Sequence, residues 1–197
     1  AVSISKVNFE QNSQEKLTSD LLEKRDIAIA ANKLVKDGDT IVIDTGSTMS
    51  IFAEAITAKD LTIVTNDLSI ALTMEKNKDY RIVLLGGVVR NDYHCTLGAT
   101  TVEQLQTLHV DKAFVATNSI TVKNGLSTPD LNHAVIKRHM IASADQTILL
   151  ATGNKFGRKS FAHFASITEI DKIVTDVSAP EDEIKAARVL NVDVIIA

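Results

Sequence analysis

The sequence has little of several residue types, and each shortage excludes a class of protein. Among its 197 residues there are one cysteine, Cys95, and two prolines. A lone cysteine cannot form an internal disulfide, and two prolines cannot make a proline-rich linker. The formal net charge is −4 and the lysines and arginines are spread out. Direct nucleic-acid binding by this chain is therefore not expected, because it requires a concentrated basic face.

Long apolar runs are missing too. No stretch approaches the roughly 20 apolar residues that a membrane-spanning helix needs. The start AVSISKVNFEQ lacks the basic segment followed by an apolar segment that is typical of a signal peptide. We therefore expect a cytoplasmic protein with no membrane partner. Because His94 and Cys95 have no second His/Cys pair at metal-ligand spacing, we expect no metal site. We also expect no cofactor. We expect His133, His139 and His163 to be surface or packing residues.

What the chain does contain is a regular alternation of short apolar runs and helical patterns. The predicted strands are Thr40–Asp44, Leu61–Thr65, Arg81–Leu85, Lys112–Ala116, Thr147–Ala151, Lys172–Thr175 and Val192–Ile196. The predicted helices are Ser13–Lys36, Thr48–Ala58, Asp67–Lys76, Thr101–Leu108, Leu131–Ala144 and Pro180–Val189. This alternation predicts an α/β fold, a three-layer and mostly parallel sheet with helices on both faces. The stretches 86–98 and 118–130 are the longest without clear periodicity, and because both follow predicted strands they could be loops of a site.

The most informative stretch is residues 41–48, IVIDTGST. It predicts a buried strand that breaks into a small-residue turn and opens a helix. The free backbone N–H groups of a helix start bind anions, and the Ser and Thr hydroxyls add donors. A phosphate or another small oxyanion is therefore the first ligand to consider.

Other predicted strands end in similar polar segments. These segments are Thr65-Asn66-Asp67, Gly86-Gly87 with Arg90 close behind, Thr117-Asn118-Ser119, and residues 152–157 with Lys155. Ligands of parallel sheets bind beyond the carboxyl ends of the strands, so these segments could line one polar pocket for a polyol with an anionic group. Each has a plainer explanation: Asp44, Ser47 and Asn66 could simply cap helices.

A set of ordered segments resembles the C-terminal sensor domain of DeoR-family bacterial transcription regulators. The segments are KRDIAIAANKLVKDGDTIVIDTGST, LTIVTNDLSIAL, RIVLLGGVVRNDYHCTLG, VDKAFVATNSI, NGLSTPDLNHAVIKRHMI, ILLATGNKFGRKSF and IDKIVTD, and they cover roughly Lys24 to Asp176. The resemblance implies a fold like that of ribose-5-phosphate isomerase and the CoA transferases. It also implies a phosphorylated sugar, or a related metabolite, as effector.

The same resemblance implies a domain organisation and partners. Residues 1–14 would be a linker remnant to an N-terminal winged helix-turn-helix absent from this chain, and residues 15–197 would be the effector-binding domain. The chain would be part of a repressor of sugar metabolism that meets operator DNA only through the absent module. It would form a homodimer or a higher homo-oligomer.

Several residues match the family motifs one by one. The implied effector-binding residues are Asp44, Gly46, Ser47, Thr48, Thr65, Asn66, Gly86, Gly87, Arg90, Asn118 and Lys155. Ser47, Thr48 and Lys155 would meet the phosphate or the sugar, and Asp44 would accept from sugar hydroxyls. The chain departs from the family pattern at Ala151, where an aspartate is usual.

Two alternatives stay open. A sugar-phosphate isomerase of the same fold needs a general base near the substrate, and the stretch after Ala116, where such isomerases carry an acidic cluster, has no carboxylate. That absence favours a sensor without catalytic residues. The departure at Ala151 gives weight to an oligomerisation module with a vestigial pocket.

Overall fold

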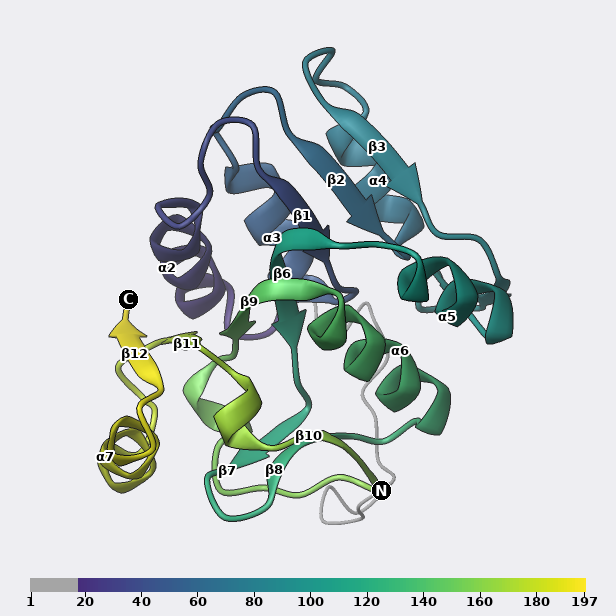
Figure 1. Cartoon of the computed structure of the whole chain (residues 1–197). Helices are drawn as coiled ribbons and strands as arrows, with labels where there is room; N and C mark the ends of the chain where they lie inside the picture. The colour runs from purple at the N-terminus through teal and green to yellow at the C-terminus, as the bar shows by residue number, and fades with distance from the viewer. Residues whose placement is uncertain (1–17) are drawn as a thin grey trace.

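The computed structural model describes residues 18–197 and has a seven-stranded sheet at its centre (Figure 1). All neighbouring strands of this sheet run parallel. In order across the sheet they are β12 (Asp193–Ile196), β11 (Lys172–Thr175), β9 (Ala144–Leu150), β6 (Val110–Ala116), β1 (Thr40–Ile43), β2 (Thr62–Thr65) and β3 (Arg81–Leu84). Each predicted strand is present, and the predicted parallel sheet is confirmed.

The central strands are apolar along their length because both faces of the sheet are covered. In β1, Ile41 and Ile43 enter one hydrophobic cluster, while Val42 between them enters the other. Side chains of a strand point alternately to the two faces, so a continuous apolar run supplies two cores at once. The sheet is therefore the middle of three layers, as predicted.

Helices form the outer layers (Figure 1). The face of Ile41 and Ile43 is covered by α2 (Leu21–Asn32), α3 (Ser47–Ala55) and α4 (Leu68–Met74). The face of Val42 is covered by α5 (Ala99–Gln106), α6 (Leu131–Ala142) and α7 (Glu181–Val189). Five of them lie close to their predicted ranges, whereas α2 begins only at Leu21, after Asp20 with φ of 51°, and ends at Asn32, so the predicted range Ser13–Lys36 was too long. None of the helices within residues 18–197 is long and apolar enough to cross a bilayer. The predicted linker 1–14 and the predicted helix start at Ser13 lie outside the described residues.

The prediction of loops over 86–98 and 118–130 was wrong in part. The first stretch holds an antiparallel pair, β4 (Val88–Arg90) and β5 (Cys95–Leu97). The second supplies two strands of a small antiparallel sheet, formed in the order β10 (Ala162–Ala165), β8 (Gly125–Thr128) and β7 (Ser119–Thr121). Strands of this length are too short to produce a readable periodicity, so their partners elsewhere in the chain decide their conformation.

Candidate functional site

A cavity of about 310 Å³ opens where β1, β2 and β6 end. Its wall is formed by the loop after β1, the start of α4, the residues after β6, and two side chains of α6. Three lysines, Lys24, Lys137 and Lys155, are among its lining residues. Many of the remaining lining residues carry a hydroxyl, an amide or a carboxylate. Segments far apart in sequence thus meet at the carboxyl edge of the sheet, as the strand-end argument predicted.

The start of α3 forms one wall of this cavity. Gly46 precedes the helix with φ of 130° and contributes no side-chain cap, and the first turn holds no acidic residue. Ser47 and Thr48 line the cavity directly. The first backbone N–H groups of a helix have no partner inside it, so this end of α3 presents donors and a partial positive charge to any ligand there.

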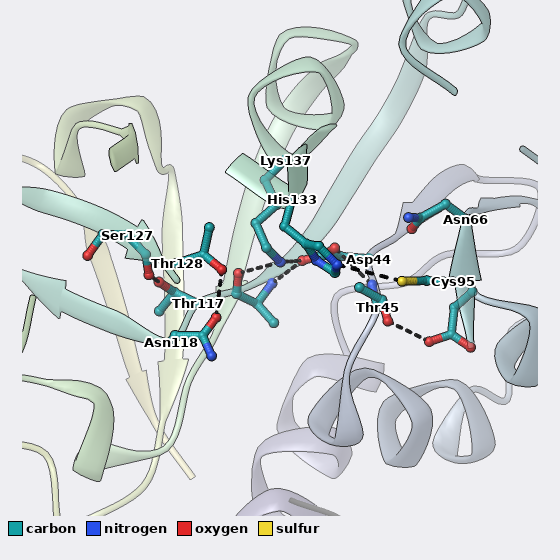
Figure 2. Close-up of polar contacts among 12 residues, drawn as sticks. Asp44, Thr45, Asn66, Cys95, Thr117, Asn118, Ser127, Thr128, His133 and Lys137 are labelled. Atoms are coloured by element: carbon teal, nitrogen blue, oxygen red, sulfur yellow. Dashed lines mark hydrogen bonds and ion pairs between the residues drawn. The ribbon is translucent and has the colours of Figure 1, made fainter. Parts of the chain in front are cut away.

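Asp44, at the end of β1, lies just behind the cavity wall. It is 1% exposed and is not among the lining residues. One carboxylate oxygen accepts from the N–H of Thr45 at 2.8 Å. The other accepts from the N–H of Ala116 at 2.9 Å and forms an ion pair with Lys137 (Figure 2). Asp44 therefore joins β1, β6 and α6, and its expected contact with sugar hydroxyls stays a prediction.

The segment after β2 contributes one lining residue, Asp67, which belongs to the predicted polar segment but not to the residues implied by the family motifs. Thr65 and Asn66 are buried, and the amide nitrogen of Asn66 donates to the carbonyl of Thr96. Asp67 lines the cavity instead, caps α4 by accepting from Ser69 N–H at 2.9 Å, and accepts from the Thr45 hydroxyl at 2.8 Å. Burial raises the pKa of the Asp67 carboxyl above its ordinary value, although these hydrogen bonds oppose the rise.

The glycine pair after β3 packs against neighbouring protein segments. Gly86 N–H donates to the Gln104 side chain, and Gly86 C=O accepts from the Thr101 hydroxyl. A Cβ on Gly87 would lie 2.4 Å from that hydroxyl oxygen and 2.6 Å from the Leu97 carbonyl oxygen. Neither glycine lines the cavity.

Arg90 lies behind two lining residues. Its Nη1 is 3.0 Å from His133 Nε2, and its guanidinium lies 3.7 Å from the centre of the Tyr93 ring. His133 and Tyr93 both line the cavity, whereas Arg90 does not. The expected role of Arg90 toward an anion stays a prediction, and the geometry places it as a support for these two rings.

The remaining predicted residues reach the cavity. Asn118 lines it while its side-chain oxygen accepts from the Thr128 hydroxyl at 2.9 Å. Lys155 lines it from the short 3-10 helix Gly153–Lys155. Among the residues predicted to bind the effector, those that line the cavity are Gly46, Ser47, Thr48, Asn118 and Lys155. Those that do not line it are Asp44, Thr65, Asn66, Gly86, Gly87 and Arg90.

The sequence matches the model of one protein family, described as the DeoR C terminal sensor domain, over residues 19–177. The chain belongs to this family. Among its relatives is the HTH-type transcriptional regulator GlpR of Haloferax volcanii, 34% identical over 98% of this chain and 77% of GlpR. Another is the HTH-type transcriptional repressor GlcR of Bacillus subtilis, 33% identical over 78% of this chain and 59% of GlcR.

Solved structures agree on the fold of this sensor domain. A probable sor operon regulator from Shigella flexneri superposes with a TM-score of 0.54 at 10% identity. The match covers 88% of this chain and 89% of that one. At this identity the likeness concerns the fold alone, and it agrees with the predicted three-layer α/β architecture.

The sensor domain also holds two lining residues on α6 that the sequence argument did not assign. His133 was expected to be a surface or packing residue, and it is buried as packing requires, but it also lines the cavity. Lys137 lies one turn further along the same helix face. The sequence held one signal for these two residues. His133 and Lys137 are basic side chains four residues apart, on a helix face that they share with apolar Ala134 and Met140. Among residues 18–197, no group of three His, Cys, Asp or Glu side chains could hold a metal ion.

Cys95 is predicted to be chemically inert in the folded sensor domain. Burial raises the pKa of its thiol to about 11, the charge of Asp67 adds to the rise, and Arg90 opposes it. Relative to the ordinary value of 9.0, the thiolate that reacts is about a hundredfold scarcer. We therefore expect iodoacetamide at pH 8 to modify the native protein at least about a hundredfold more slowly than the urea-unfolded protein. Mass spectrometry measures the rate of Cys95 modification in both states. Equal rates in the native and the unfolded protein would contradict the buried placement of Cys95.

Proposed function

We propose that this chain is the effector-binding domain of a transcriptional repressor of sugar metabolism, and that its cavity binds a phosphorylated sugar. Operator binding would reside in a helix-turn-helix module outside these 197 residues, since GlpR and GlcR are both described as HTH-type regulators. Effector binding would then change operator affinity through a coupling between the two sites. We also propose that the protein works in the cytoplasm as a homodimer or a higher homo-oligomer.

The observation that carries this proposal is the joint placement of the α3 N-terminus and lysines around one cavity. Ser47 and Thr48 open the helix there, and Lys24 and Lys155 line the same space. A helix N-terminus with added ammonium groups favours a phosphate over a neutral ligand. A phosphorylated ligand is therefore the chemistry that this wall fits best.

The rest of the cavity suits the sugar part of such a ligand. Its lining includes the hydroxyl-bearing residues Thr45, Ser50, Ser69 and Thr117 and the amide-bearing residue Asn118. Groups of this kind exchange hydrogen bonds with a polyol in both directions. The volume of about 310 Å³ lies at the lower end of the range usual for small-molecule sites, which is appropriate for a monosaccharide phosphate.

The carboxylates of the cavity support a sensor rather than an isomerase. They belong to Glu54 and Asp67. Asp67 already accepts hydrogen bonds from Thr45, Ser69 and Ile70. A general base needs a lone pair within reach of the substrate proton, and both Asp67 oxygens already accept hydrogen bonds, Oδ1 from the start of α4 and Oδ2 from the Thr45 hydroxyl. Sugar-phosphate isomerisation by the purified protein, lost on Asp44→Asn or Asp67→Asn, would overturn the sensor assignment.

Thermal unfolding with a panel of sugar phosphates tests the proposal. We expect at least one of glucose 6-phosphate, fructose 6-phosphate, fructose 1-phosphate and ribose 5-phosphate to raise the Tm by about 5 to 10 °C at a hundredfold excess over its Kd. No shift with any hexose or pentose phosphate would instead favour an oligomerisation module with a vestigial pocket.

Lys155 provides the site-specific test. Lys155→Met should weaken binding of the stabilising sugar phosphate about tenfold or more, because a charge-assisted hydrogen bond to the phosphate is lost. Lys159→Met is the matched control, since Lys159 is exposed and outside the cavity lining. Titration calorimetry gives both affinities. Unchanged affinity in Lys155→Met would refute the role assigned to Lys155.

A further inference from the structure

Lys137 is a buried lysine that lines the cavity and whose ammonium group is held in place by the protein. It extends from α6, is 3% exposed, and lines the cavity. Its ammonium forms an ion pair with Asp44 and donates to the carbonyl oxygen of Ala116 at 3.1 Å. Figure 2 shows the Lys137 side chain extending toward this pair of partners at the ends of β1 and β6. Its position is therefore determined from both strands.

The donor count at Lys137 leaves one N–H group for a ligand. An ammonium group has three N–H donors, and two of them are used by Asp44 and Ala116. Within residues 18–197 no third acceptor contacts this nitrogen, and the nearest aromatic ring, that of Phe164, has its centre 5.8 Å away. A buried donor without an acceptor is unfavourable, so an oxygen atom brought by a ligand would be stabilised there.

The charge around the Lys137 ammonium group indicates which kind of ligand oxygen its third N–H would donate to. Asp44 lies behind the wall and neutralises Lys137. The pair together therefore presents a donor with little net charge, which suits an uncharged oxygen better than a phosphate. We propose that Lys137 binds the sugar part of the effector, donating its third N–H to a hydroxyl or carbonyl oxygen, while the α3 wall binds the phosphate. This inference rests on the proposed function and adds a specificity-determining residue to it.

Titration calorimetry with two ligands tests this division of roles. Wild-type protein should bind the best sugar phosphate of the panel more tightly than inorganic phosphate, and the ratio of the two affinities measures the contribution of the sugar. Lys137→Met should reduce the affinity for the sugar phosphate about tenfold to a hundredfold, while the affinity for inorganic phosphate changes less than about threefold. Arg138→Met is the matched control, because Arg138 bonds the carbonyls of His163 and Phe164 and lies outside the cavity lining.

Lys137→Met leaves the buried Asp44 charge unpaired, and this could prevent the variant from folding. A second variant therefore tests the same role. The double variant Asp44→Asn with Lys137→Gln removes both charges together and should show the same selective loss of sugar-phosphate affinity. Equal losses for both ligands, or no loss for either, would overturn the role of Lys137 while leaving the proposed function intact. Wild-type protein that binds no sugar phosphate more tightly than inorganic phosphate would overturn both.

Discussion

Asp44→Ala should lower the free energy of unfolding by about 3 to 5 kcal/mol, because it leaves the buried Lys137 ammonium without its counter-charge. The substitution also removes the acceptor for the N–H groups of Thr45 and Ala116. An unpaired buried charge costs far more than the net contribution of the intact pair. Urea denaturation followed by circular dichroism measures the change, with the midpoint and the slope reported separately.

The matched control for this prediction is an exposed ion pair. Lys185 pairs with Glu181 one turn away on α7, and both side chains are largely exposed. Lys185→Gln should therefore change stability by well under 1 kcal/mol. In the double variant Asp44→Asn with Lys137→Met, the loss should be smaller than the sum of the two single losses, because no charge is left unpaired. A loss below about 1 kcal/mol for Asp44→Ala would contradict the structural role assigned to the pair.

Gly87→Ala should destabilise the protein by about 2 to 4 kcal/mol. Gly87 has φ of 154°, and an added Cβ would lie 2.4 Å from the Thr101 hydroxyl oxygen and 2.6 Å from the Leu97 carbonyl oxygen. The hydroxyl cannot move freely, because it donates to Gly86 C=O at 2.7 Å. The substitution must therefore shift either α5 or the β4–β5 pair, and urea denaturation reports the cost.

The neighbouring glycine is a natural control for Gly87. A Cβ on Gly86 would lie 3.2 Å from the end of the flexible Gln104 side chain, which can move aside. Gly86→Ala should therefore cost less than about 1 kcal/mol. The family resemblance assigned both glycines to the effector, whereas the structure gives Gly87 a packing role. A Gly87→Ala protein of wild-type stability that no longer binds the sugar phosphate would show that the packing role is wrong.

The layers of this fold follow directly from its sequence. A continuous apolar run such as Ile41-Val42-Ile43 can be stable only where both faces are covered. Helical patterns between such runs then supply the covering layers. The position of the cavity follows from the same pattern, because parallel strands end at one edge and the polar residues after them meet there. Ser47, Thr48 and Lys155 were found in this way.

Tertiary structure alone decided which side chains line the cavity and which support them. Asp44 and Lys137 lie 93 positions apart in sequence, and only the packing of α6 across the ends of β1 and β6 brings them together. The same holds for Gly87, whose small size is required by Thr101 and Leu97. Sequence patterns report whether a residue is buried or exposed. The partner of a buried polar group depends on distances between elements, and those are fixed only when the layers pack.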